Sequence, residues 1–145
     1  MVCKQYKQEN FSLISGYFSK REIARYTNTG WWKLLSILSL YRSEFYLLWD
    51  DNKVIGTGVI RWKWSRESHA FGWWLYAIWI HPNHRGNGFG EVLMNELITI
   101  LKLRNISKVE LTVDINNIVA INLYKKIGFV EVKQVSNYIV MQYDL

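Results

Sequence analysis

The chain has 145 residues, of which 50% are hydrophobic and 21% charged, and this balance predicts one folded domain rather than a disordered chain. Its single cysteine, Cys3, excludes an internal disulfide, and three histidines without ligand spacing argue against a metal site. The longest strongly apolar run, residues 71–80, is too short to cross a bilayer, and the first residues lack the apolar stretch of a secretion signal. We therefore expect a cytoplasmic protein with no membrane span.

The charge balance favours anionic partners. Lys and Arg total 18 against 12 for Asp and Glu, a net charge of +6. A basic surface attracts polyanions, so nucleic acid and phosphorylated cofactors both stay open as partners.

Apolar periodicity divides the first half of the chain into helices and strands. Helical spacing predicts helices over residues 8–26 and 31–41, separated by a loop at 27–30. Residues 45–49 and 54–64 are typical strands, and the Asp and Asn residues at 50–52 favour a turn between them, so the pair predicts a hairpin. Residues 72–80 predict a third strand, which its continuous apolar character indicates is buried on both faces.

The second half alternates helices with strands. The predicted elements are a helix over residues 88–103, a strand over 108–115, a helix over 117–126 ended by Gly128, and strands over 129–133 and 138–143. An antiparallel half followed by a βαβ unit predicts an α/β or α+β layered sheet.

The loop from Ile80 to Gly90 carries the most specific chemistry. It joins the end of a buried strand to the start of a helix, where glycines let the backbone approach a ligand and free N–H groups face anions. No Gly-Lys-Ser/Thr follows Gly90, so the loop is not a Walker nucleotide-binding loop, and the first glycine of the dinucleotide-binding fingerprint is replaced. The spacing present is Arg-x-x-Gly-x-Gly, starting at Arg85. The loop predicts phosphate binding, and a purely structural glycine turn is the alternative.

Two motifs resemble the GNAT superfamily of N-acetyltransferases. The Arg-x-x-Gly-x-Gly loop after an apolar-x-Pro step is similar to that family's pyrophosphate loop. Residues 117–129 fill every fixed position of its Asn-x-x-Ala-x-x-Leu-Tyr-x-Lys-x-Gly-Phe motif. The likeness covers residues 45–145 and implies a central, mixed, mostly antiparallel sheet with a splayed βαβ unit and helices on both faces. It also implies one acetyltransferase domain over 1–145, with a helical acceptor-side segment at 1–43 and a cofactor-binding core at 44–145.

The resemblance implies acetyl-CoA as the acetyl donor, with no metal. In the family the loop holds the cofactor's diphosphate on backbone N–H groups, and a strand N–H polarises the thioester carbonyl. The residues assigned to the cofactor in this way are Ile78, Trp79, Ile80, Arg85, Gly86, Asn87, Gly88, Phe89, Gly90, Asn117 and Tyr124.

Tyr124 matches the family tyrosine that protonates the departing thiolate. A phenol suits this role because its reference pKa of ~10 lies near that of a thiol, ~8.5. An aromatic side chain that only packs at the end of a helix is the alternative. Asn117 matches a residue that binds the pantetheine arm or the acceptor, and it would equally serve as a helix N-cap without any ligand.

The motifs leave the general base open. The two glutamates used by different branches of the family correspond to Trp74 and Thr112, so both are absent. Asp114, Glu110, Glu67 and His69 are the remaining candidates. We expect Asp114 because it shares a strand face with Thr112, and a solvated charge at the strand end is the alternative.

The acceptor is predicted to be a primary amine on a small molecule or a peptide. Trp62 and Trp74 lie on the two strands that border the acceptor side in the family, and they would either line that side or pack in the core. A homodimer stays open, and no membrane partner is expected. The alternative reading is a basic RNA-binding protein, or an acetyltransferase directed at aminoacyl-tRNA, although no RNA-binding aromatic motif is present.

Overall fold

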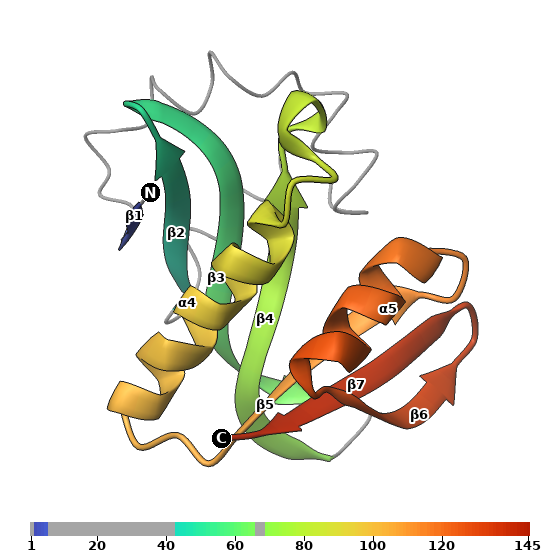
Figure 1. Cartoon of the computed structure of the whole chain (residues 1–145). Coiled ribbons are helices and arrows are strands. Elements are labelled where there is room, and N and C mark those ends of the chain that lie inside the picture. Colours follow the sequence, from blue (N-terminus) through green and yellow to red (C-terminus); the bar gives the residue numbers. More distant parts are fainter. Residues whose placement is uncertain (1, 6–42, 66–68) are drawn as a thin grey trace.

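The computed structural model describes residues 2–5, 43–65 and 69–145, which build one mixed sheet with two α-helices (Figure 1). The elements are β1 (Val2–Gln5), β2 (Ser43–Asp50), β3 (Lys53–Ser65), β4 (Ala70–Ile80), the 3₁₀ turn η2 (Pro82–His84), α4 (Phe89–Leu103), β5 (Lys108–Asp114), α5 (Ile118–Ile127), β6 (Val130–Val135) and β7 (Tyr138–Asp144). The seven strands lie in the order β1-β2-β3-β4-β5-β7-β6, with β4 and β5 parallel and the other pairs antiparallel. This is the mixed, mostly antiparallel sheet that was expected.

Most predicted elements are confirmed within a few residues, and two predictions need correction. The sequence did not predict β1, which pairs antiparallel with β2 at the edge of the sheet. β4 is only partly buried: Leu75 is buried on the face that carries the helices and Trp74 and Trp79 on the other, whereas the remaining residues are half-buried or exposed. The reason is that one edge of β4 has no neighbouring strand, among the described residues, over most of its length. The helices predicted over 8–26 and 31–41 lie outside the described residues.

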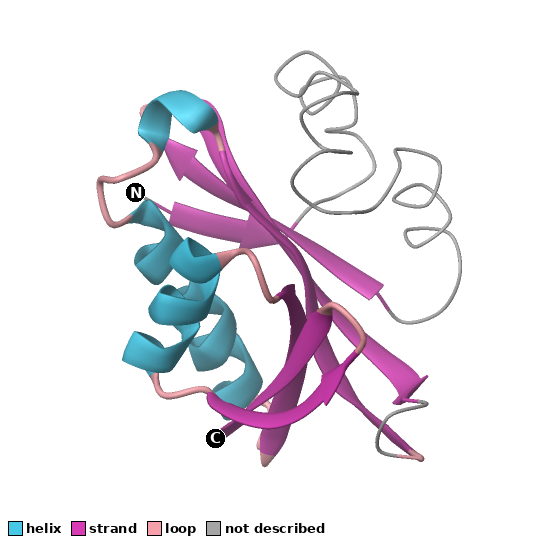
Figure 2. Cartoon of the chain, turned by 90° about the vertical axis from the view of Figure 1, so that its right-hand side faces the viewer, coloured by secondary structure: helices cyan, strands magenta, loops and turns pink. Residues whose placement is uncertain are grey.

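The two described helices lie on the same face of the sheet (Figure 2). We call it the helix face, and its core joins apolar residues of the sheet to α4 residues such as Leu93, Leu97 and Leu101. On the opposite face a smaller cluster contains Phe45, Leu47, Val54, Val59 and Trp79. The helical cover expected on that face would fall on residues outside the described ranges. None of the described helices is long and apolar enough to cross a membrane.

A charged group fixes the C-terminal end of α4 to the sheet. Arg104, the C-cap of α4, donates two hydrogen bonds to the Glu44 carboxylate of β2, with N–O distances of 2.7 and 2.6 Å. The Tyr46 hydroxyl donates to the same carboxylate at 2.5 Å. The hydrogen bonds from Arg104 are the main reason that the pKa of Glu44 lies below its usual value. This network orients α4, whose other end begins at the glycine loop.

We expect Glu44→Gln to destabilise the protein at pH 7 by no more than about 1 kcal/mol, because the pair is partly exposed. A lowered carboxyl pKa in the folded state adds stability above the unfolded value of 4.5, and this stability disappears as the pH falls through the folded pKa. Urea unfolding of both proteins at pH 7 and pH 3 checks this. A difference that persists at pH 3 would contradict it.

Candidate active site

The sheet opens where β4 and β5 separate. The two strands share the register pairs Trp73–Val109 and Trp74–Glu110, and beyond these they diverge, as Figure 1 shows. β4 continues to Ile80 and β5 to Asp114 without pairing to each other. We call this stretch the β4–β5 opening, and it confirms the splayed βαβ unit. It exposes two strand edges whose backbone groups can bind an extended ligand.

A bulge in β4 marks the middle of the opening. The register between β3 and β4 shifts between Thr57 and Val59, and Ala77 has a φ of 48°. The Thr57 hydroxyl donates a hydrogen bond to the Ala77 carbonyl oxygen at 3.1 Å. Left-handed backbone at a non-glycine residue is uncommon and is often found at functional sites. The sequence contains no signal for it, because alanine has no preference for positive φ.

The last residues of β4 turn backbone groups into the opening. The His81 N–H donates to the Ile55 carbonyl of β3 at 2.8 Å, so the preceding residue, Ile80, directs its own N–H and carbonyl away from β3. The Arg85 Nε accordingly donates to the Ile80 carbonyl oxygen at 2.9 Å. By the same alternation Ile78 also directs its N–H into the opening, whereas that of Trp79 faces β3. Of the three predicted strand donors, Ile78 and Ile80 therefore direct their N–H groups toward the opening, and their role toward a cofactor stays a prediction.

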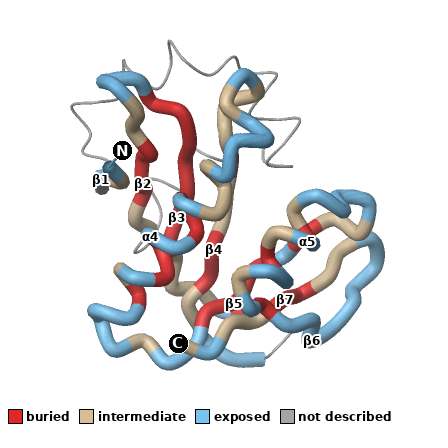
Figure 3. The backbone as a smooth tube through the Cα atoms, viewed as in Figure 1, coloured by how far each residue is buried: buried red, intermediate tan, exposed pale blue. Residues whose placement is uncertain are grey.

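The glycine loop follows β4 directly and leads into α4. Gly86 and Gly88 have φ values of 77° and 79°, which L side chains rarely adopt, so these two positions require glycine for their backbone conformation. The first N–H groups of α4, from Phe89 onward, have no partner in the preceding turn of helix, as at any helix N-terminus. Figure 3 shows this loop as an exposed segment above the buried part of β4. The arrangement offers backbone donors to an anion.

Close contacts hold α4 and α5 together beside the loop. A Cβ on Gly90 would lie 3.1 Å from the Leu123 Cδ2 of α5, so glycine here permits the two helices to approach. Lys126 of α5 forms an ion pair with Glu91 in the first turn of α4, at 2.6 Å. The sequence grouped Gly90 with the anion loop, whereas the structure gives it a packing role as well.

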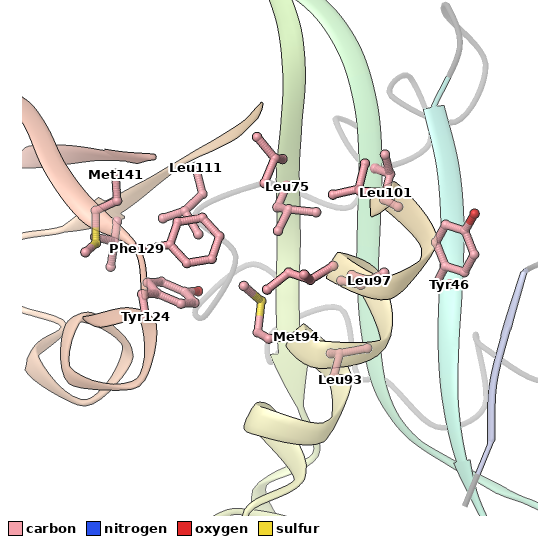
Figure 4. Packing of buried hydrophobic residues seen from close by; sticks show 14 of the residues in the cluster. Tyr46, Leu75, Leu93, Met94, Leu97, Leu101, Leu111, Tyr124, Phe129 and Met141 are labelled. Carbon is pink, nitrogen blue, oxygen red and sulfur yellow. The ribbon is translucent and has the colours of Figure 1, made fainter. Parts of the chain in front are cut away.

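Tyr124 lies in α5 on the helix face of the opening. Figure 4 shows its hydroxyl directed from α5 toward Met94 of α4, while its ring packs near Phe129, with 5.9 Å between ring centroids. The residue is 7% exposed, and no side chain or backbone group in the described ranges forms a hydrogen bond with its hydroxyl. Burial raises the pKa of Tyr124 to about 12, so the phenol keeps its proton at neutral pH. Within the described part of the chain, it is a proton donor without a structural partner.

Asn117 and Asp114 both have structural roles in the turn from β5 to α5. The Asn117 side chain caps α5 by accepting a hydrogen bond from the Ala120 N–H at 3.3 Å. The Asp114 Oδ1 accepts from the Asn116 N–H at 2.8 Å and from its Nδ2 at 3.1 Å. These contacts explain both residues without a ligand, and the ligand role of Asn117 and the base role of Asp114 stay predictions.

Trp62 and Trp74 lie on opposite faces of the sheet, so they cannot line one acceptor surface together. Trp62 pairs with Trp73 across β3 and β4, and both rings are on the helix face, 5.3 Å apart. Trp74 is fully buried on the opposite face, where the Lys63 Nζ lies 4.1 Å from its ring centroid. The one-residue alternation of strands separates them, although both lie on the strands that border the acceptor side in the family.

We expect Gly88→Val to weaken coenzyme A binding at least about tenfold, because a β-branched residue at this positive φ is strained by about 1–3 kcal/mol and turns the loop N–H groups away. A Cβ there would meet no atom within 4 Å, so the backbone rather than a clash causes the effect. Isothermal titration calorimetry measures the affinity, and thermal unfolding checks the fold. A well-folded variant with unchanged affinity would contradict the loop assignment.

Comparison with known proteins agrees with this geometry. The sequence profile of the acetyltransferase (GNAT) family matches residues 8–129. An uncharacterized N-acetyltransferase of Methanocaldococcus jannaschii is 37% identical over 86% of this chain, and the chain spans 53% of that protein's length. An N-alpha-acetyltransferase of Sulfurisphaera tokodaii is 26% identical over 93% of this chain and 86% of its own length.

Solved structures share the fold. A GNAT family acetyltransferase from Elizabethkingia anophelis, solved with acetyl-CoA bound, superposes with a TM-score of 0.75 at 15% identity, covering 99% of this chain and 97% of that one. The match to the family profile defines the class of the protein as an acetyltransferase, and the shared fold agrees with it. The chain belongs to the GNAT family of acetyltransferases.

Proposed function

We propose that the protein transfers the acetyl group of acetyl-CoA directly to a primary amine. The observation that carries the proposal is the β4–β5 opening, which has the glycine loop at one end and, on its helix face, the Tyr124 hydroxyl without a partner among the described residues. A loop of backbone donors suits a diphosphate, and a free strand edge suits an extended amide chain. The residues present therefore fit coenzyme A.

Each part of the opening has a role in this proposal. Acetyl-CoA supplies an activated thioester when bound. The N–H groups of the loop from Gly86 to Gly90, with Arg85, hold the diphosphate, and the N–H groups of Ile78 and Ile80 donate along the strand edge, where one of them polarises the thioester carbonyl. Tyr124 gives its proton to the departing thiolate. Asn117 keeps one amide donor for the pantetheine arm or the acceptor while its oxygen caps α5.

The acceptor class that we favour is the α-amino group at a protein N-terminus. The support is the similarity to the Sulfurisphaera protein, whose name states that activity. Trp74 and Tyr76 of β4, together with Glu110 of β5, lie on the opposite face of the sheet, and we place the acceptor on that side. Trp62 faces away from it and takes no part in this proposal.

The test is a screen of amines with acetyl-CoA, read as release of free thiol. The panel holds lysine-free peptides with free amino termini starting with Ala, Ser or Met, the same peptides already acetylated at the N-terminus, spermidine and glucosamine. We expect thiol release with the free peptides and none with the acetylated ones. Release with spermidine or glucosamine alone would refute the acceptor class, and no release with any amine would refute the proposed function.

A further inference from the structure

One charged side chain is buried in the described part of the sheet without a partner. Glu110 of β5 is 4% exposed, and no residue in the described ranges donates a hydrogen bond to its carboxylate or forms an ion pair with it. Glutamate is rarely buried in a folded protein unless its carboxylate is paired. Neither the sheet nor its core requires a glutamate at this position, so a function explains it better.

Glu110 lies where the two strands separate. Trp74–Glu110 is the last register pair before the opening. Because Val109 and Leu111 on either side of Glu110 belong to the helix-face core, Glu110 points to the opposite face. Tyr124 reaches the opening from the helix face, so the two groups border it from two sides.

The space beside Glu110 holds an unused donor as well. The Trp74 indole N–H is buried and has no hydrogen-bond partner among the described residues. A Cβ added at Gly72 would lie 3.7 Å from the Glu110 Oε2 and 3.7 Å from the Trp74 Nε1. The missing side chain at Gly72, on the paired side of Trp74, therefore leaves room next to one free acceptor and one free donor, an arrangement suited to a water.

We propose that Glu110, rather than Asp114, is the proton acceptor for the amine, which approaches the opening from the opposite face. This inference rests on the proposed acetyl transfer. Trp74, the register partner of Glu110, is four residues from Ile78, one of the two N–H donors proposed for the thioester carbonyl. Four residues of extended chain span about 13 Å at ~3.3 Å per residue, so the proton travels through water in the opening rather than by direct contact. The role of Glu110 is thus to hold that water chain and take up the proton at its carboxylate.

The protons balance in the following way. The ammonium gives one proton through water to the Glu110 carboxylate, and the neutral amine forms the C–N bond at the acetyl carbon. The C–S bond breaks, and the thiolate takes the Tyr124 proton. The second nitrogen proton returns to the Tyr124 phenolate, and Glu110 releases its proton to solvent. Overall, an ammonium and a thioester give an amide, a free thiol and one proton.

Several other ionisable groups lie on the opposite face of the described sheet. Arg61 and Lys63 lie on β3, Tyr76 on β4, Lys108 and Asp114 on β5, and Tyr138 and Asp144 on β7, with Lys4 on β1 and Lys133 on β6 farther from Glu110 in the sheet order. Arg61 pairs with Trp74 across β3 and β4, and its buried Nε has no partner in the described ranges. Its positive charge must therefore be considered when variants that change a charge on this face are compared.

The experiment compares wild type with Glu110→Gln, Glu110→Asp, Asp114→Asn and the charge-matched control Asp144→Asn, using acetyl-CoA and the peptide that releases most thiol with wild type. We expect Glu110→Gln to lower kcat/KM at pH 7 about tenfold, because an α-amino group with a reference pKa of ~7.7–8.0 is only about one-tenth neutral at that pH. The deficit should shrink as the pH approaches the pKa of the amine, because the amine is then already neutral. Glu110→Asp should lose less, and Asp144→Asn should behave as wild type.

Two readouts separate this role from a structural one. The Glu110→Gln substitution removes a buried charge, so the unfolding midpoint of this variant should equal or exceed that of wild type, with coenzyme A affinity unchanged. An unaltered pH profile in Glu110→Gln, or a larger loss in Asp114→Asn, would overturn the assignment while leaving acetyl transfer intact. If wild type itself releases no thiol with any amine of the panel, the proposed function fails and this inference fails with it.

Discussion

Tyr124→Phe is expected to lower the turnover of acetyl transfer by about 10²–10⁴-fold, the usual contribution of general acid catalysis. The substitution removes the phenolic proton and leaves the ring against Phe129. Because no described residue forms a hydrogen bond with the hydroxyl, the free energy of unfolding should change by less than about 1 kcal/mol. Steady-state kinetics with the most active peptide of the panel measure the loss.

Two controls define the role of Tyr124. Affinity for acetyl-CoA should change far less than turnover, because the lost interaction strengthens mainly in the transition state. Since burial raises the pKa of Tyr124 to about 12, its ionisation should produce no fall in wild-type activity between pH 7 and 10. An equal loss of affinity would make Tyr124 a binding residue, and full activity in Tyr124→Phe would make it a packing residue.

The fold was largely predictable because its elements have strong periodicity and clear ends. The apolar stripe of Leu93, Leu97 and Leu101 predicted α4, and Asn117 and Gly128 bound α5 as an N-cap and a left-handed C-cap. β1 was missed because four residues are too few to show alternation. The burial of β4 was overestimated because an apolar run does not reveal that a strand loses its neighbour partway along.

The candidate site was predictable where backbone chemistry determines it and unpredictable where tertiary contacts do. Glycines at positive φ indicated the loop, and the structure places two of them, Gly86 and Gly88, in that conformation. Glu110 was one of four candidate bases, but nothing in the sequence distinguished it from Asp114, because burial depends on neighbouring strands that a local pattern does not report. The same limit explains why the bulge at Ala77 was not foreseen.

Leu97→Ala is expected to destabilise the protein by about 2–5 kcal/mol, the usual cost of truncating a buried leucine. Leu97 is fully buried in α4 and packs against the sheet (Figure 4). With a typical total stability of about 5–15 kcal/mol, this loss would be visible as a clear shift of the urea midpoint. A change below about 1 kcal/mol would mean that neighbouring side chains refill the space.

The glycine opposite the bulge explains why Leu97 matters to the site. A Cβ on Gly58 would lie 2.7 Å from the Leu97 Cδ1 and 3.2 Å from the Ile78 Cδ1, so Gly58→Ala alone overpacks this point by about 1–3 kcal/mol. Leu97→Ala removes the closer atom, so the double variant should be more stable than the sum of the single losses predicts, by about 1 kcal/mol. Urea unfolding of the four proteins measures this coupling. Additive losses would show that the two positions do not interact, whereas coupling would show that α4, which follows the glycine loop, packs directly against β3 opposite the bulge.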